Sequence, residues 1–256
     1  MMKVVKIGGN VIDDDAALDS FIRDFSALEG EKILVHGGGR LATRLCEQLG
    51  IQTTMIDGRR VTDSETIDVV TMVYAGLINK RIVARLQAAG CNAIGLSGAD
   101  AGVVKATRRA PQPVDFGFVG DIATEGVNAD FLVGLTVQGV VPVICSIMHD
   151  GCGTLLNCNA DSVASAVAVA AARKTETELL LCFEKRGVLS DVDNPDSVIE
   201  EICPENYRQL LADSVVSKGM IPKIDGAFAA LERGVRRVII KHSTELLADC
   251  GTKILK

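Results

Sequence analysis

The stretches VVKIGGN, residues 4–10, and ILVHGGGRLA, residues 33–42, decide the fold of this chain. Each joins a short run of Val, Ile and Leu to two or three glycines, and a helical pattern follows. A continuous apolar run suits a strand that is covered on both faces of a parallel sheet. Glycine then permits the sharp turn into the next helix. Two such units in succession predict an α/β protein.

The same alternation continues along the whole chain. We expect strands at residues 3–7, 32–36, 92–96, 140–145, 178–182 and 236–240. We expect helices at residues 16–28, 41–49, 64–89, 129–138, 161–172, 204–212 and 220–233. Strands that alternate with helices form a parallel sheet with helices on both faces. The pattern therefore predicts a three-layer αβα fold on an open, mainly parallel sheet.

One segment, residues 103–126, breaks this alternation. Its sequence VVKATRRAPQPVDFGFVGDIATEG contains two prolines and several glycines, which predict hairpins and loops laid over an edge of the sheet. Such an excursion between α/β units often becomes a lid or a wall of the substrate site. Because no internal repeat or linker is visible, we expect a single domain over residues 1–256.

Composition and charge bound the functional classes. The chain has 256 residues, of which 48% are hydrophobic, enough for one large core or two tightly joined lobes. The formal net charge of −6 argues against binding of nucleic acid or an anionic membrane through the overall field of the protein. A local basic site for phosphate remains compatible with that charge.

The cysteines and the chain start bear on the compartment. None of the eight cysteines forms a C-x-x-C pair, so zinc-ribbon spacing is absent and free thiols in a reducing environment are expected. Neither a secretory signal nor an apolar run long enough for a bilayer is visible. We expect a soluble cytoplasmic protein.

Both glycine turns are candidate anion sites, because glycine lets an anion approach the backbone amides and a helix begins just beyond. Lys6 interrupts an apolar strand directly before the first turn, and a half-buried lysine needs an anionic partner. A plain tight turn and a solvated lysine are the alternative interpretations. Two neighbouring turns favour one shared phosphate site.

A dinucleotide site competes with this interpretation. Gly37, Gly39 and Ala42 fit G-x-G-x-x-A, and Asp57 follows at a suitable distance. A dinucleotide domain normally opens with that unit, whereas here a strand and a helix precede it. A P-loop is excluded because the chain has no Gly-Lys dipeptide.

Three further motifs carry polar groups toward the same region. Arg60 in GRRVT, residues 58–62, could clamp a carboxylate with two hydrogen bonds. The motif NCNAD, residues 157–161, lies at a strand–helix junction, where Asn159 suits a helix cap. Lys223 opens the last long helix against the dipole preference, so a nearby anion would explain it. A solvated loop, simple capping and an exposed lysine are the plain alternatives.

Taken together, these motifs resemble the amino-acid kinase family. KIGG at 6–9, HGGG at 36–39, GRRVT, NCNAD and GMIPK at 219–223 occur in the family's order over nearly the whole chain. The resemblance implies an amino-terminal lobe for the amino acid, about residues 1–157, and a carboxyl-terminal lobe for ATP, about residues 158–256.

The resemblance also assigns residues. Lys6 and Lys223 match the lysines that stabilise the transferring phosphoryl group, and Asp161 matches the aspartate that holds them. The substrate-binding positions would be Gly38, Gly39, Arg60, Asn157 and Asn159. The nucleotide-binding positions would be Gly8, Gly9, Glu184, Lys185, Gly187, Val188, Leu189, Ser217, Gly219 and Met220. No residue is expected to be a protein ligand of a metal.

The activity implied by the resemblance is ATP-dependent phosphorylation, with Mg²⁺, of the side-chain carboxylate of an N-acylated glutamate in arginine biosynthesis. Acetyl is the expected acyl group, and succinyl or another small carboxylate or carbamate substrate remains an alternative. An ionised carboxylate needs no general base, so alignment and charge neutralisation would do the catalysis. A non-catalytic sensor of amino acid or nucleotide is the alternative from another class.

Two features depart from the family. In the nucleotide loop at residues 183–189, Lys185 and Arg186 are unusual; they could touch phosphate or close a salt bridge over the adenine. The chain begins its first strand at residue 3 without the extra helix of arginine-inhibited relatives, so a homodimer without that feedback is expected.

Overall fold

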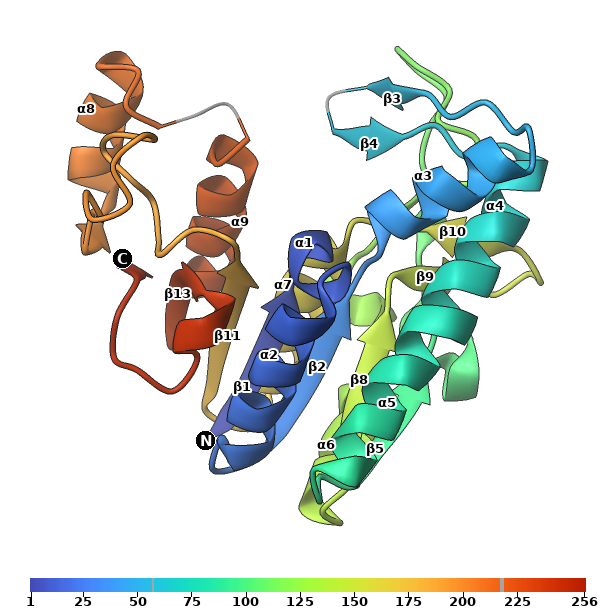
Figure 1. The fold of residues 1–256 in the computed structure, drawn as a ribbon, viewed down its shortest axis with the longest axis horizontal. Coiled ribbons are helices and arrows are strands. Elements are labelled where there is room, and N and C mark those ends of the chain that lie inside the picture. The colour runs from blue at the N-terminus through green and yellow to red at the C-terminus, as the bar shows by residue number, and fades with distance from the viewer. Residues whose placement is uncertain (57, 217–218) are drawn as a thin grey trace.

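The computed structural model describes residues 1–56, 58–216 and 219–256. Its centre is an eight-stranded sheet in the order β12-β14-β13-β11-β1-β2-β8-β5 (Figure 1). The six strands from β13 to β5 run parallel, and β14 and β12 run the other way. The bounds are β1 Met2–Ile7, β2 Lys32–His36, β5 Ala93–Leu96, β8 Val141–Cys145, β11 Thr177–Phe183, β12 Glu201–Ile202, β13 Arg237–His242 and β14 Thr252–Ile254.

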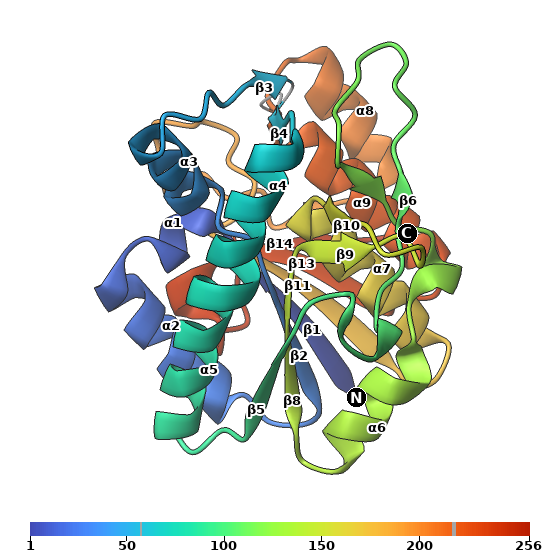
Figure 2. The ribbon, with the colours of Figure 1, turned by 90° about the vertical axis from the view of Figure 1, so that its right-hand side faces the viewer.

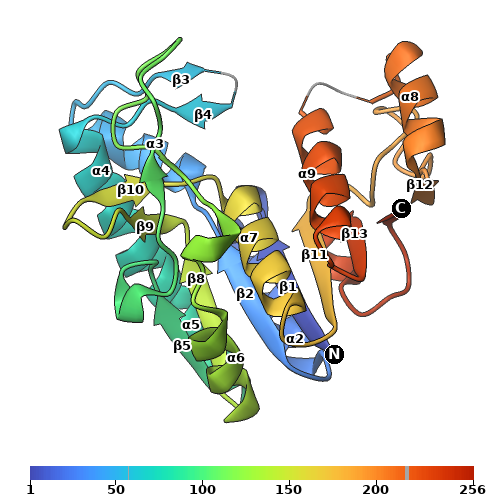
Figure 3. The same cartoon turned by 180° about the vertical axis from the view of Figure 1, so that it is seen from behind.

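Helices cover both faces of this sheet. One face carries α2 (Asp15–Ala27), α3 (Gly39–Gln48), α4 (Ser64–Thr71) and α5 (Asn79–Ala88), whose apolar side chains form one core cluster. The other face carries α6 (Ala129–Val137), α7 (Ala160–Ala172) and α9 (Ile221–Glu232), which form the second cluster (Figure 3). The short α1 (Gly9–Ile12) and α8 (Pro204–Ala212) complete the set of α-helices in the described residues. The predicted three-layer αβα fold is confirmed.

Local sequence explains the elements nearest the site. Every residue of β2 and of β11 is buried, as expected for central strands covered on both faces. Helix α2 places Leu18, Phe21, Ile22 and Phe25 on one stripe against the sheet, and the Asp14 side chain caps its first turn. The alanine-rich α7 is buried along most of its length, because small side chains let it lie close to the sheet.

The predicted elements agree with the structure except at one helix. All six predicted strands are present as the six parallel strands. The single helix expected over residues 64–89 is wrong in one respect, because residues Met72–Ile78 form a π-helix between α4 and α5. The strands β12 and β14 at one end of the sheet were not predicted, since two or three residues carry too little periodicity to show in a sequence.

Short hairpins cluster at the carboxyl ends of the parallel strands (Figure 2). They are β3 (Met55–Ile56) with β4 (Arg59–Arg60), β9 (Ile147–His149) with β10 (Leu155–Asn157), and β6 (Thr107–Arg108) with β7 (Gly120–Asp121). The hairpin expected within 103–126 is therefore present. Its return arm forms isolated bridges to Thr62 and Asn157, which places it beside the site residues rather than over a plain sheet edge.

The structure bears on two features expected from composition, which are free cysteine thiols and the lack of a membrane-spanning segment. All eight cysteines are free thiols, and five of them are buried. Within the described ranges, no helix has the length and apolar character needed to cross a membrane.

Candidate active site

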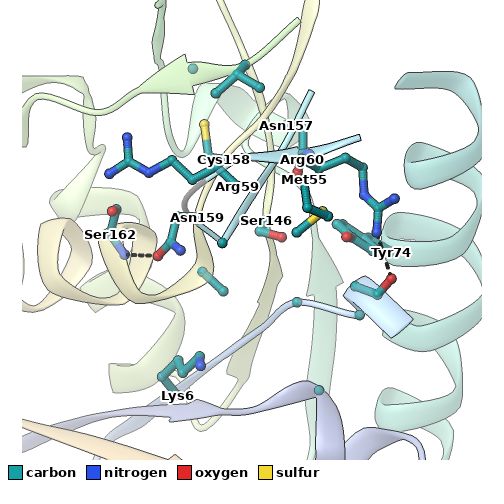
Figure 4. Close-up of a pocket in the computed structure, with 18 of the residues that line it drawn as sticks. Lys6, Met55, Arg59, Arg60, Tyr74, Ser146, Asn157, Cys158, Asn159 and Ser162 are labelled. Atoms are coloured by element: carbon teal, nitrogen blue, oxygen red, sulfur yellow. Dashed lines mark hydrogen bonds between the residues drawn. The ribbon is translucent and has the colours of Figure 1, made fainter. Parts of the chain in front are cut away.

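A cavity of about 220 Å³ opens at the carboxyl ends of β1, β2 and β8 (Figure 4). Arg60 and Tyr74 lie on one side of it, Asn159 and Ser162 lie on the other, and Lys6 lies below. We refer to this cavity as the polar pocket. The five residues that sequence assigned to substrate binding all line it, namely Gly38, Gly39, Arg60, Asn157 and Asn159.

The second glycine turn forms the floor of the polar pocket. A Cβ atom on Gly38 would lie 2.2 Å from Cδ1 of Ile78 and 3.0 Å from Cδ1 of Tyr74, so a side chain there would have to displace both. Helix α3 begins at Gly39, and the first amides of a helix have no acceptor within it. These amides are available to an anion at the positive end of the helix.

A buried histidine holds this turn from beneath. His36 is fully buried; its Nδ1 lies 2.9 Å from the Gly37 carbonyl and its Nε2 lies 3.0 Å from Nδ2 of Asn79. Burial lowers the pKa of His36 to about 4 despite the hydrogen bond to Gly37. The imidazole is therefore neutral at pH 7, with Nδ1 donating and Nε2 accepting.

Arg60 is a buried cation that lacks an anionic partner. Arg60 is only 6% exposed. Its Nη2 donates hydrogen bonds to the Gly39 carbonyl at 2.9 Å and to Oγ1 of Thr43 at 2.6 Å. Its Nη1 is buried without a hydrogen bond, and no carboxylate of the described residues forms an ion pair with it. A buried, half-satisfied guanidinium is unstable without an anion, so the geometry indicates a carboxylate ligand.

Two asparagines also line the polar pocket. Asn157 ends β10 and donates from Nδ2 to Oγ1 of Thr62 at 3.1 Å. Asn159 caps α7, because its Oδ1 accepts from the amides of Asp161 at 2.9 Å and Ser162 at 3.1 Å. The cap predicted at Asn159 is confirmed, and it fixes the first turn that carries Asp161.

Asp161 joins two lysines that are far apart in sequence. Its Oδ1 lies 2.8 Å from Nζ of Lys6, and its Oδ2 accepts a hydrogen bond from Nζ of Lys223. Burial alone would raise the pKa of Asp161, but the charges and hydrogen bonds of both lysines outweigh it and lower the pKa to about 2. The carboxylate is thus ionised at pH 7 and holds both ammonium groups in fixed positions.

A second cavity, of about 250 Å³, lies beyond Lys223. Seven residues assigned to the nucleotide line it, and we refer to it as the apolar pocket. They are Glu184, Lys185, Gly187, Val188, Leu189, Gly219 and Met220. Phe183, which lies inside the predicted nucleotide loop at 183–189, also lines it, and so does Val192, which was not predicted. Ser217 lies outside the described residues.

The first glycine turn lies closer to the polar pocket than to the apolar one. Gly9 lines the polar pocket together with Lys6. Gly8 lines neither pocket, and its amide donates to the Cys182 carbonyl at 3.0 Å. The nucleotide role of Gly8 and Gly9 stays a prediction.

The two unusual residues of the nucleotide loop point in different directions. Lys185 lines the apolar pocket, whereas Arg186 donates from Nη1 to Oδ1 of Asp196 at 2.8 Å and from Nε to Oε1 of Glu245 at 3.1 Å. Arg186 lines a separate cavity on the other side of the loop. It therefore fastens the loop to its surroundings instead of facing the apolar pocket.

Sequence reasoning missed several residues that line the polar pocket. Ser146 follows the end of β8, a position that could have been found from the strand end alone. Arg109 and Asp121 form an ion pair on the hairpin of residues 103–126, and no local pattern predicts that they face the pocket. Tyr74 comes from the middle of a helix and gave no signal.

Comparison with known proteins identifies the class. The model of the amino acid kinase family matches residues 1–242, and this chain belongs to that family. Acetylglutamate kinase of Phocaeicola vulgatus is 49% identical over 255 residues, covering 100% of this chain and 98% of the relative. Acetylglutamate kinase of Cytophaga hutchinsonii is 50% identical over 259 residues, covering 98% and 97%.

The fold comparison agrees. The crystal structure of smu.665 from Streptococcus mutans superimposes with a TM-score of 0.82 at 28% identity, covering 99% of this chain and 98% of that one. The G-x-G-x-x-A pattern at 37–42 is therefore a glycine turn of the amino acid kinase fold and not a dinucleotide fingerprint. Asp57, the residue that completed that rival pattern, lies outside the described residues.

Proposed function

We propose that this chain catalyses the ATP-dependent phosphorylation of the side-chain carboxylate of N-acetyl-L-glutamate, a step of arginine biosynthesis. One observation carries the proposal: Asp161 is paired with Lys6, which lines the polar pocket, and with Lys223, which lines the apolar pocket. The substrate follows from the relatives named acetylglutamate kinase that match the chain over nearly its whole length.

The polar pocket would hold the amino acid. The unpaired Nη1 of Arg60 would bind its α-carboxylate, replacing the missing anionic partner. The amides at Gly38 and Gly39 would orient the side-chain carboxylate toward Lys6, since they sit at the start of α3. Asn157, which also lines the polar pocket, would hydrogen-bond the acyl amide.

The apolar pocket would hold the nucleotide base. Val188, Leu189 and Met220 offer apolar surface of the kind that buries a flat ring. Lys223 opens α9 at the inner end of this pocket, so phosphates bound there would extend toward both lysines. The division into an amino-acid lobe, about 1–157, and an ATP lobe, about 158–256, is part of this proposal. The apolar pocket is lined only by residues beyond 158, whereas the polar pocket also includes Cys158, Asn159, Ala160 and Ser162 from the start of the second lobe.

The reaction needs alignment and neutralised charge. The ionised side-chain carboxylate attacks the γ-phosphorus, a C–O–P bond forms, and the bond from the γ-phosphorus to the bridging oxygen breaks to release ADP. Lys6 and Lys223 would stabilise the negative charge on the transferring phosphoryl group. Asp161, with its pKa of about 2, acts as an organiser of the lysines and not as a base.

Mg²⁺ does not fit as a metal held by protein ligands. Among the residues that the structure describes, no three His, Cys, Asp or Glu side chains are grouped to bind an ion. Asp161 is already occupied by two lysines. Mg²⁺ usually binds phosphate oxygens and retains water ligands, so we propose that it enters with ATP, and no step is assigned to a protein-bound metal.

Trapping of the acyl phosphate by hydroxylamine tests the proposed function. The purified chain is incubated with ATP, Mg²⁺ and, in separate reactions, N-acetylglutamate, N-succinylglutamate, glutamate, aspartate and carbamate. We expect hydroxamate with N-acetylglutamate and none with free glutamate or aspartate. No turnover with any substrate would contradict the proposal and favour a sensor.

N-succinylglutamate is a second candidate because of one observation. Arg59 lines the polar pocket and forms no ion pair with another described residue. The succinyl group carries an additional carboxylate that such a cation could bind. In the same assay, a kcat/KM for N-succinylglutamate above that for N-acetylglutamate would favour this substrate.

Assembly and location stay predictions. A homodimer in the cytoplasm is expected from the family resemblance, without feedback by arginine. Light scattering after size-exclusion chromatography, with and without arginine, tests the assembly: a dimer under both conditions is expected, and a hexamer would contradict it.

A further inference from the structure

The π-helix Met72–Ile78 packs directly on the glycine turn of the polar pocket. Three side chains of this helix and its boundary reach the turn: Tyr74 and Ile78 contact Gly38, and Asn79 lies beside His36. π-helical turns are rare and occur frequently at functional sites. This π-helix contributes Tyr74 to the polar pocket, a residue that is not among the predicted binding residues.

The π-helical geometry explains how Tyr74 reaches the pocket. The amide of Asn79 donates to the Tyr74 carbonyl, five residues earlier. Residues five apart therefore face the same side here, whereas a regular α-helix of 3.6 residues per turn separates them. Asn79 is anchored, because its Nδ2 donates to the Val143 carbonyl at 2.9 Å and lies 3.0 Å from His36. That anchor fixes Tyr74 over the turn.

The phenol of Tyr74 is buried in the protein but faces the pocket. The residue is only 5% exposed, lines the polar pocket, and lies next to the Arg60 guanidinium (Figure 4). Burial raises the pKa of Tyr74, while the charge of Arg60 and a side-chain hydrogen bond with Arg60 oppose that shift. The phenol is therefore neutral at pH 7. Because a guanidinium only donates, the hydroxyl proton of Tyr74 is not used by Arg60 and can be donated to a ligand.

We propose that Tyr74 is a specificity-determining residue of this site, which closes the Arg60 end of the polar pocket and sets the chain length of the N-acylated dicarboxylic amino acid that fits. The proposal rests on the proposed function. Arg60 would hold one carboxylate and Lys6 would face the other, so the spacing between them selects the chain. A longer chain needs room that the ring of Tyr74 occupies.

Two substitutions separate the roles of ring and hydroxyl. In Tyr74→Phe we expect KM for N-acetylglutamate to rise about 5-fold to 10-fold with kcat within about twofold, because one hydrogen bond is lost and the shape is kept. In Tyr74→Leu we expect the ratio of kcat/KM for N-acetyl-2-aminoadipate, one methylene longer, to that for N-acetylglutamate to rise at least about tenfold. An unchanged ratio in an active Tyr74→Leu enzyme would overturn the proposal.

The chain offers a matched control. Tyr207 is the second of its two tyrosines, is buried in the other core cluster, and donates its hydroxyl to Oδ1 of Asp225 at 2.9 Å. Tyr207→Phe removes a phenolic hydroxyl far from the polar pocket. We expect it to leave both KM for N-acetylglutamate and the homologue ratio unchanged. A KM shift as large as that of Tyr74→Phe would show that the kinetic effect is not local, and would contradict the proposal.

A binding measurement tests Tyr74 without turnover. The chain has no tryptophan, so in the Tyr207→Phe variant Tyr74 is the sole source of tyrosine fluorescence. We expect N-acetylglutamate to change that fluorescence saturably, with ATP alone giving no comparable change. Saturable binding with unchanged fluorescence, established by calorimetry, would overturn the proposal. If the wild-type chain forms no acyl phosphate, the proposed function fails, while this titration still decides whether Tyr74 faces the bound dicarboxylate.

Discussion

The polar and apolar pockets meet at Asp161 but are built by different means. The polar pocket has fixed charges and tight packing: Arg60 is held by Gly39 and Thr43, and Gly38 is pressed against Tyr74. The apolar pocket is lined largely by a loop, residues 183–192, whose apolar members are Phe183, Val188, Leu189 and Val192. If the proposed function is correct, the fixed polar groups of the polar pocket would select a small charged ligand by their geometry. The apolar pocket would bury the nucleotide base against a loop that must be held in position.

Substitution of either lysine between the two pockets should have the largest effect on turnover. In Lys6→Ala or Lys223→Ala we expect kcat to fall about 10³-fold, about 4 kcal/mol, because charge stabilisation in the transition state is lost. Both KM values should change only a few-fold. Steady-state kinetics checks this, with the surface residue Lys174, paired with Asp130, as the alanine control. Equal losses in kcat and in substrate binding would contradict the assigned roles.

Arg60 tests the polar pocket alone. In Arg60→Met we expect KM for N-acetylglutamate to rise about 10²-fold, about 3 kcal/mol, because a charged hydrogen-bonded contact is lost. KM for ATP should stay within twofold. Arg236→Met, which removes an exposed ion pair with Glu176, serves as the control. A parallel rise of both KM values would mean that the two pockets are not separate sites.

Asp161 links the site to stability. Its pKa is lowered from 3.8 to about 2, so its ion pairs stabilise the folded chain fully above pH 4, and this contribution is lost as pH falls through 2. We expect the difference in free energy of unfolding between wild type and Asp161→Asn to shrink by about 2 kcal/mol from pH 6 to pH 2. Urea denaturation at several pH values measures it. A difference independent of pH would contradict the lowered pKa.

Arg186 gives the smallest expected effect and tests the apolar pocket alone. Its ion pairs with Asp196 and Glu245 are partly exposed, so their loss should cost little stability. In Arg186→Ala we expect KM for ATP to rise about fivefold, about 1 kcal/mol, as the loop loses its fastening, with KM for N-acetylglutamate unchanged. Glu245→Gln should act in the same direction, and the double variant should be less than additive. Full additivity would show that the pair does not act together.

The site residues that could be predicted from the sequence are those at strand ends and at a helix cap. Lys6 precedes a glycine turn at the carboxyl end of the parallel strand β1, whereas Asn159 and Asp161 follow the short antiparallel strand β10 at the start of α7, which packs on β1. Local pattern and fold class together predicted these positions. The glycine turn at 36–39 was likewise predicted, although only the structure shows that Tyr74 and Ile78 pack against Gly38 where a side chain would lie.

The sequence could not predict contacts that depend on a change of helix type or on long loops. Tyr74 faces the pocket because a π-helix replaces the expected α-helix, and apolar periodicity does not distinguish the two. Arg186 turns away from the apolar pocket because Asp196 and Glu245, 10 and 59 residues further along, lie on the other side of the loop. Such partners are set by tertiary packing.

A crystal structure with N-acetylglutamate, ADP, Mg²⁺ and aluminium fluoride is the most direct measurement. We expect N-acetylglutamate in the polar pocket with a carboxylate on Arg60, adenine in the apolar pocket, and the aluminium fluoride within hydrogen-bonding distance of Nζ of both Lys6 and Lys223. An aluminium fluoride group that contacts neither lysine, or an amino acid bound away from Arg60, would contradict the proposal that Asp161 organises phosphoryl transfer between the two pockets.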